Sequence, residues 1–296
     1  MSSAEEHLAV REGVGLFDFS FMGHYEFDDA EALQALQSRD LTGLEIGQIA
    51  YTLLLAPNGA VRIDATVWRR GPRRYWLFAG KRAAYGGRDR SGELAILALQ
   101  GPASGTVLAR LIGRDAVAAL RYFRFTEVQE IIVARIGYCG ELGYELLVPA
   151  DEVNALRRRL LEAGRVEGLR ECGWAAADSL RIEAGYVLFD REVDGEANPR
   201  ELGLERLVDG GTRFALRRRL AGLEILEGRP GAELPPAAIT SECLSPTLGK
   251  ALALGFVAPE AVIGSEVRAG DRRARVAELP FYDRERLRPR AAPLPG

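Results

Sequence analysis

The stretch Gly137-Tyr-Cys-Gly-Glu-Leu-Gly-Tyr-Glu-Leu-Leu147 places a carboxylate, Glu145, inside an apolar strand that directly follows a glycine-punctuated turn. An ionised glutamate that is buried without hydrogen-bond donors is strongly destabilising. The fold must therefore offer Glu145 either an arginine or a ligand that presents paired N–H groups. The stretch alone leaves both alternatives open.

A second carboxylate, Asp64, lies in a strand that follows a predicted hairpin turn. Asn58-Gly59 separates the apolar strand 49–55 from the strand 60–68, and Asn-Gly supplies the positive φ angles of a tight turn. Successive side chains of a strand alternate between its faces, so Asp64 and Thr66 share one face. By itself, this pattern is typical of a half-exposed sheet.

The remaining pattern predicts a mixed α and β chain in three parts. We expect residues 1–208 to form one domain of two lobes, residues 209–285 to form a small C-terminal β-barrel, and residues 286–296 to be disordered. Predicted helices cover residues 30–37, 104–111, 151–163 and 173–184. Predicted strands beyond the hairpin cover residues 23–27, 74–78, 94–99, 128–136 and 144–148.

Composition excludes several classes of protein. The net charge of −3, from 39 Lys+Arg against 42 Asp+Glu, gives no general attraction for nucleic acid, and no apolar run reaches membrane-spanning length. Three distant cysteines and two histidines argue against a metal site and against a disulfide framework. The acidic, polar start is unlike a signal peptide. We therefore expect a cytoplasmic protein that binds neither nucleic acid nor membrane.

Four segments together resemble the folate-binding aminomethyltransferase family, which includes the glycine cleavage T-protein and the folate domains of dimethylglycine and sarcosine oxidising enzymes. They are Tyr51-Thr-Leu-Leu-Leu with Gly59-Ala-Val-Arg-Ile-Asp-Ala-Thr-Val67, the stretch from Tyr138 to Glu145, Asp178-Ser-Leu-Arg-Ile-Glu-Ala-Gly185, and Ile239-Thr-Ser-Glu-Cys-Leu-Ser-Pro246. Matching segments occur in the family's order from residue 11 to residue 283. The resemblance implies an α+β fold of three lobes around a folate channel, with a C-terminal β-barrel.

The resemblance also implies roles for individual residues. Asp64 falls on the family's catalytic aspartate, and Glu145 falls on the glutamate that holds the pterin of tetrahydrofolate. The other residues expected to bind this cofactor are Tyr138, Arg181, Tyr51, Thr66 and Met22. Arg181 has an equally good structural alternative, because Asp178 precedes it at helical ion-pair spacing.

The chain departs from the family pattern at several positions. Phe21 stands where the family usually has histidine, and Ile63 replaces the first aspartate of the glycine-cleavage enzymes. The segments 80–92 and 228–238 are shortened, which leaves Arg229 as the nearest candidate for a ligand-facing arginine of the family. These departures count against a glycine-cleavage role.

From the residues and the resemblance together, we expect a tetrahydrofolate-dependent aminomethyltransferase or methyltransferase. It would move a one-carbon unit from an amine, ether or thioether donor to tetrahydrofolate, with Asp64 as the catalytic residue. The expected partners are a small-molecule donor and either a carrier protein or a separate amine oxidase. Two alternatives stay open: a folate-binding regulator or assembly factor without catalysis, and a structural protein with a vestigial channel.

Overall fold

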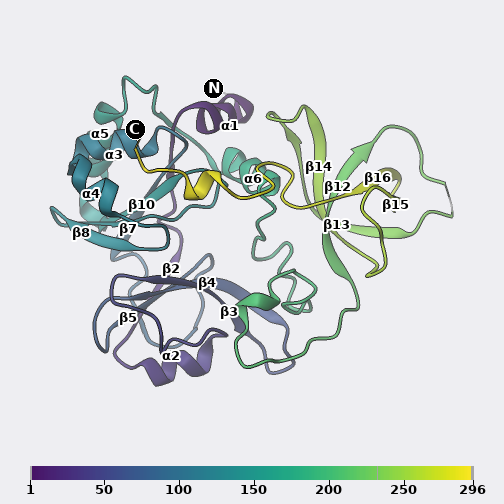
Figure 1. The fold of residues 1–296 in the computed structure, drawn as a ribbon, viewed down its shortest axis with the longest axis horizontal. Helices are drawn as coiled ribbons and strands as arrows, with labels where there is room; N and C mark the ends of the chain where they lie inside the picture. The colour runs from purple at the N-terminus through teal and green to yellow at the C-terminus, as the bar shows by residue number, and fades with distance from the viewer. Residues whose placement is uncertain (1, 232, 295–296) are drawn as a thin grey trace.

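A computed structural model describes residues 2–231 and 233–294 of the chain. Figure 1 shows two sheets with their helices in the N-terminal part and a separate barrel formed by the C-terminal part. The expected fold class, a mixed α and β chain that ends in a small β-barrel, is confirmed. Within the described residues, no helix combines the length and the apolar character needed to cross a membrane.

The first sheet has six strands in the order β11-β1-β7-β10-β9-β8. Its strands are β1 (Gly15–Asp18), β7 (Leu94–Gln100), β8 (Phe125–Val128), β9 (Ile131–Ala134), β10 (Gly143–Pro149) and β11 (Arg170–Glu171). Helices α3 (Ser104–Ile112), α4 (Arg114–Ala119) and α5 (Val153–Ala163) pack on one face through a shared apolar core. Because side chains alternate along β10, Leu146 faces these helices, whereas Glu145 and Leu147 face the other way.

The second sheet has five strands in the order β3-β4-β5-β2-β6. They are β2 (Gly23–Phe27), β3 (Ile49–Leu55), β4 (Val61–Arg69), β5 (Tyr75–Ala79) and β6 (Arg88–Asp89). Helix α2 (Ala30–Leu36) covers the outer face, where Ile63 and Val67 pack with Leu33. On the inner face Trp68 and Phe78 pack in one core with residues of the first sheet. The two sheets therefore face each other.

The hairpin between β3 and β4 differs in detail from the expected tight turn. Gly59 has a φ of 82°, but Asn58 keeps a negative φ, so Asn-Gly does not supply two positive angles. The amide of Gly59 donates to the carbonyl of Ala56, and the amide of Ala56 donates to the carbonyl of Ala60. One glycine in the left-handed conformation is therefore sufficient to reverse the chain.

Two helices connect the sheets to the barrel. Helix α1 (Ser3–Glu12) packs against α6 (Trp174–Glu183), and Figure 1 shows α6 between the first sheet and the barrel. The buried guanidinium of Arg11 ties them together through Glu183 at 2.8 Å. On the barrel side, Ile182 of α6 packs with Leu252 and Leu254.

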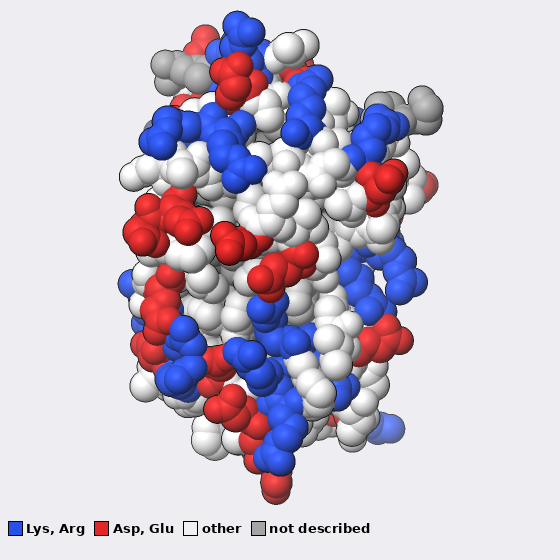
Figure 2. Space-filling view, turned by 90° about the vertical axis from the view of Figure 1, so that its left-hand side faces the viewer, with Lys and Arg blue, Asp and Glu red and all other residues white. Residues whose placement is uncertain are grey.

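The C-terminal part forms a closed five-stranded barrel. Its strands are β12 (Arg219–Leu226), β13 (Pro236–Ser245), β14 (Lys250–Val257), β15 (Glu266–Ala269) and β16 (Arg272–Ala277), in the order β12-β14-β13-β15-β16. Pairing of β12 with β16 closes the barrel around small apolar side chains such as Ala253 and Val276. Figure 2 shows both signs of charge interspersed on one face of the molecule.

The segment that follows the barrel is ordered as far as it is described, contrary to the expectation of disorder from residue 286 onward. It contains the 3-10 helix Arg288–Arg290 with a buried Pro289 and returns to the N-terminal part. Composition alone missed this order because the contacts that hold the segment come from distant parts of the chain. Residues 295–296 lie outside the described residues.

Candidate functional site

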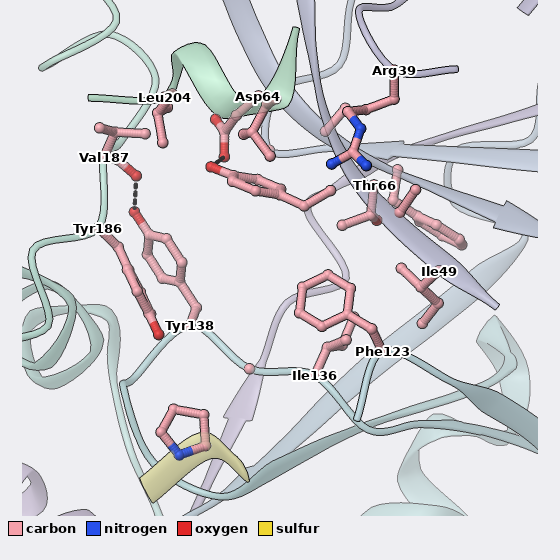
Figure 3. A pocket seen from close by; sticks show the side chains of 18 of the residues that line it. Arg39, Ile49, Asp64, Thr66, Phe123, Ile136, Tyr138, Tyr186, Val187 and Leu204 are labelled. Atoms are coloured by element: carbon pink, nitrogen blue, oxygen red, sulfur yellow. Dashed lines mark hydrogen bonds between the residues drawn. The ribbon is translucent and has the colours of Figure 1, made fainter. Parts of the chain in front are cut away.

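A cavity of about 1030 Å³ lies between the two N-terminal sheets. Its walls also include the segment after α6, residues 185–189, and the C-terminal segment at residues 286–290. Figure 3 looks into this cavity and shows aromatic side chains around much of its wall. Six of the seven residues expected from the sequence to form the site line it: Met22, Tyr51, Asp64, Thr66, Tyr138 and Glu145.

Asp64 projects into the cavity from β4 together with a tyrosine of the neighbouring strand. The hydroxyl of Tyr51 donates a hydrogen bond to Oδ2 of Asp64 at 2.9 Å (Figure 3). Burial raises the pKa of Asp64 above its ordinary value; the Tyr51 hydrogen bond opposes this rise, and the negative charge of Glu192 adds to it. Burial also raises the pKa of Tyr51 well above its ordinary value. Tyr51 therefore stays protonated and donates.

Thr66 shares the cavity face of β4 with Asp64, as strand alternation predicted. Its hydroxyl oxygen accepts a hydrogen bond from the indole nitrogen of the buried Trp68 at 2.9 Å, which fixes the threonine side chain. Ile63 points to the opposite face, into the core beneath α2. The replacement of an aspartate by Ile63 therefore does not remove a polar group from the cavity wall.

Glu145 reaches the same cavity from β10, on the first sheet. Its side chain is buried, with only 8 % exposed, and burial raises its pKa from 4.5 to about 7. Throughout residues 2–231 and 233–294, no arginine pairs with it and no donor is within hydrogen-bond distance. A carboxylate that is both buried and unpartnered indicates a site for a ligand with N–H groups.

Glu141, four residues earlier in the same motif, behaves in the opposite way. It is buried but pairs with Arg11 at 3.0 Å and with Arg288 at 3.3 Å. Burial raises the pKa of Glu141, while the charges of the two arginines lower it. The motif therefore contains one carboxylate that holds the protein together and one, Glu145, that faces the cavity without a partner.

The glycines of this motif serve protein packing. A Cβ on Gly137 or Gly143 would lie 2.0 or 2.3 Å from Oε1 of Gln100. A Cβ on Gly140, which has a φ of 74°, would lie 2.7 Å from Cβ of Ala184. The space beside each glycine is therefore filled by a protein side chain.

Tyr138 lines the cavity next to this turn. Its hydroxyl donates to the carbonyl oxygen of Val187 at 2.7 Å, and its ring lies 6.0 Å from the ring of Tyr186 (Figure 3). Burial raises the pKa of Tyr138 well above its ordinary value, so the phenol is neutral. With its hydroxyl engaged by the main chain, Tyr138 offers the cavity mainly its aromatic surface.

Arg181 does not line the cavity. It is fully buried and donates to Asp178 at 2.8 Å, to Glu192 at 2.8 Å and to Ser241 at 2.6 Å. These bonds join α6, the segment after it and the barrel, so Arg181 supports the cavity wall from behind. The ion pair with Asp178 expected from the helical spacing is present.

Other residues near the cavity differ from the expected set. Arg229 is exposed and does not line the cavity. Phe21 does line it, with 43 % of its surface exposed and its ring edge-on to Trp174 at 5.7 Å. Sequence reasoning missed the cavity residues Arg39, Tyr186, Arg286 and Arg290. No local pattern singles out these arginines, because their position depends on long-range packing.

Comparisons with known proteins match both parts of the chain. Residues 1–211 match the family described as the GCVT N-terminal domain, and residues 218–283 match the glycine cleavage T-protein C-terminal barrel domain. Aminomethyltransferase of Symbiobacterium thermophilum is 36% identical over 95% of this chain and 89% of its own length. Aminomethyltransferase of Bacillus subtilis is 31% identical over 96% of this chain and 91% of its own length.

A solved structure is also similar. The glycine cleavage system aminomethyltransferase T from Bartonella henselae has a TM-score of 0.82 and 27% identity, covering 96% of this chain and 90% of its own. This likeness confirms the expected fold, a T-protein fold with a C-terminal barrel. With both domain models matched across nearly the whole chain, this protein belongs to the glycine cleavage T-protein family of aminomethyltransferases.

Proposed function

We propose that this protein is a tetrahydrofolate-dependent aminomethyltransferase, in which Asp64 is the catalytic residue and Glu145 holds the pterin. The observation that carries the proposal is the placement of two carboxylates, the half-buried Asp64 and the buried Glu145, on facing sheets of one cavity. Asp64 is oriented by Tyr51, whereas Glu145 has no partner within the described part of the chain. The aminomethyltransferase names of the relatives support the reaction class.

The cavity fits the cofactor in chemistry and size. A pterin presents an amino group and an adjacent ring N–H in parallel, which match the two oxygens of Glu145. Aromatic rings from Tyr138 and Phe123 lie in the wall and suit a flat heterocycle. The cavity volume of about 1030 Å³ is at the upper end of the range for small-molecule sites, which suits an elongated ligand.

When bound, tetrahydrofolate supplies the nitrogen atoms that accept the one-carbon unit. Positive charge develops on the carbon and nitrogen as the unit leaves its donor, and the fixed anion of Asp64 stabilises that charge. Burial increases the effect, because electrostatic interactions are stronger in a site that excludes water. The Tyr51 hydrogen bond holds the carboxylate in one orientation and keeps its pKa from rising further.

We propose that the unit transferred is the methylene carbon of an aminomethyl group, whose amine is released, and that the group is presented by a carrier protein or, already oxidised to an iminium, by a separate amine oxidase. The donor would approach past Phe21 and Trp174, whose rings leave an apolar surface beside the cavity. Phe21 cannot exchange protons as the family's histidine can, so proton transfer falls to Asp64 or to the donor. We also propose the cytoplasm as its location, consistent with three cysteines that are all free.

The substitution Asp64→Asn tests the proposal. We expect tetrahydrofolate to bind nearly as tightly as in the wild type by anaerobic calorimetry, while formation of methylenetetrahydrofolate from an aminomethyl donor falls by about 10²–10³-fold. Asp115→Asn, at an exposed aspartate of α4, is the matched control and should change neither quantity. Unchanged turnover of Asp64→Asn would remove this residue from the mechanism, and no folate binding by the wild type would overturn the proposal.

A further inference from the structure

The segment that follows the barrel is built as part of the cavity wall. The match to the C-terminal barrel family ends at residue 283, yet the chain continues and turns back toward the N-terminal sheets. The carboxylate of Asp283 accepts hydrogen bonds from the backbone amides of Leu287 at 3.1 Å and Arg288 at 2.8 Å. Asp283 and Arg286 both have left-handed backbone angles, φ 53° and 54°. The turn is therefore held in one specific conformation.

Several contacts fix this segment to the first sheet. Arg288 pairs with the buried Glu141, and the guanidinium of Arg135 donates to the carbonyl oxygen of Ala291. The carbonyl of Pro293 lies so close to Gly105 that a Cβ there would approach its oxygen to 1.7 Å. Such close packing anchors the end of the segment on α3, beyond the residues that line the cavity.

Two arginines of this segment, Arg286 and Arg290, line the cavity. No acidic side chain pairs with either guanidinium anywhere in residues 2–231 and 233–294. The guanidinium of Arg286 lies 5.7 Å from the ring centre of Tyr186, which is itself next to Tyr138. Both arginines also lie close enough to Tyr122 for their positive charges to lower its pKa, against the rise caused by burial. Two unpaired positive charges therefore gather on one side of the cavity.

The other basic side of the cavity has as many carboxylates as cations, with Asp40 and Asp209 beside Arg39 and Arg206. Arg39 pairs with Asp209 at 3.1 Å, and Asp40, next to Arg39, also lines the cavity. Arg206 also lines this side, and its guanidinium donates a hydrogen bond to the carbonyl oxygen of Gly203 at 3.1 Å. The side formed by the C-terminal segment is thus the one with an excess of positive charge toward a ligand.

We propose that Arg286 and Arg290 bind the carboxylates at the glutamyl end of the folate, and that this extension sets the preference for the length of the glutamyl chain. This inference rests on the proposed function. With the pterin at Glu145 and Tyr138, the far end of an elongated ligand can reach the arginines beyond Tyr186. Guanidinium groups bind carboxylates through paired N–H donors, and each further glutamyl residue adds one carboxylate.

The experiment compares three ligands by anaerobic calorimetry: tetrahydropteroate, which has no glutamyl group, tetrahydrofolate, and its triglutamate. For the wild type we expect affinity to rise along this series by about tenfold or more, and the rise to shrink at high salt. In R286Q/R290Q the triglutamate should bind no better than tetrahydropteroate, whose own affinity should stay unchanged. R286K/R290K keeps both positive charges and should therefore retain most of the increase in affinity from tetrahydropteroate to the triglutamate.

Arg284→Gln is the matched control, because Arg284 is exposed in the same segment and does not line the cavity. Among the described residues it pairs with Glu278 alone, at 3.8 Å. If affinity rose from tetrahydropteroate to the triglutamate by the same factor in wild type and in R286Q/R290Q, the inference would be overturned, but the proposal that the protein binds folate would stand. A change in the Michaelis constant for the donor alone would assign the arginines to a donor carboxylate and would also overturn it. Failure of all three ligands to bind the wild type would instead overturn the proposed function.

Discussion

The substitution Glu145→Gln should make the protein more stable and at the same time unable to hold folate tightly. Burial raises the pKa of Glu145 from 4.5 to about 7, so above pH 7 the fold contains an ionised carboxylate without a donor. Each tenfold change in an acid constant corresponds to roughly 1.4 kcal/mol, so the rise is equivalent to about 3 kcal/mol. Glutamine carries no charge and therefore avoids this cost, although burial of its amide reduces the gain.

The difference in stability between Glu145→Gln and the wild type depends on pH, and it develops between pH 4.5 and about 7. Because the pKa of Glu145 is higher in the folded than in the unfolded state, ionisation destabilises the wild type progressively as pH rises from 4.5 to about 7. We therefore expect Glu145→Gln to match the wild type near pH 4.5 and to exceed it at pH 8, by up to about 3 kcal/mol. For a domain of this size, that gain is equivalent to a melting temperature higher by roughly 6–12 °C.

The assay is thermal unfolding at a series of pH values, combined with calorimetry of tetrahydrofolate binding. Folate affinity should fall by about 10–100-fold in the variant, since one charge-assisted pair of hydrogen bonds is lost. In the wild type, affinity should weaken below pH 7, where Glu145 must release a proton to accept two N–H groups.

Glu141→Gln is the matched control within the same motif, because the Glu141 carboxylate is paired with Arg11 and Arg288. We expect this variant to be less stable than the wild type at pH 8, since the buried Arg11 loses one of its two carboxylates, with Glu183 remaining, and the exposed Arg288 loses its partner. If Glu145→Gln were no more stable than the wild type at pH 8, or if its gain were the same at every pH, the reasoning from burial would be refuted.

Three further variants probe the surroundings of the site. Tyr51→Phe removes the hydrogen bond that lowers the pKa of Asp64, so the acidic limb of the pH–rate profile should move to higher pH. Arg181→Met leaves Glu192 buried without its cation and should lower the free energy of unfolding by about 3–5 kcal/mol in denaturant titrations. Gly140→Ala puts alanine in a left-handed backbone conformation with its Cβ against Ala184, at the end of α6. It should lower the free energy of unfolding by about 1–3 kcal/mol in the same titrations.

Each of these variants has a control in the chain. Tyr186→Phe changes a cavity phenol that does not bond Asp64, and it should leave the position of the acidic limb unchanged. Arg200→Met removes an exposed pair with Glu205 and should cost about 0–1 kcal/mol. Gly168→Ala places alanine at a φ of 69°, close to the 74° of Gly140, with open space around it, so it isolates backbone strain from the clash. Equal effects of a variant and its control would contradict the corresponding explanation.

Short-range patterns in the sequence were enough to predict most elements of the fold and part of the site. Alternation along β4 correctly predicted that Asp64 and Thr66 share one face. This prediction needs no tertiary information, because successive side chains of any strand point to opposite sides. An acidic residue within the apolar strand β10 already required an explanation, and the structure shows Glu145 on the cavity wall. The predicted helices and strands along residues 23–184 are present, with shifts of a few residues and a turn that divides the expected strand 128–136.

Only the tertiary structure decided which charged groups are paired and which are free. Glu141 and Glu145 lie in one motif, but Arg11 and Arg288, from the two ends of the chain, reach only the first of them. Arg181 turned inward because Glu192 and Ser241 accept its hydrogen bonds. The C-terminal segment became ordered because Arg135 and Glu141 hold it. Local propensity contains no information on such long-range partners, and in a buried site the partners determine whether a charge stabilises the protein or serves a ligand.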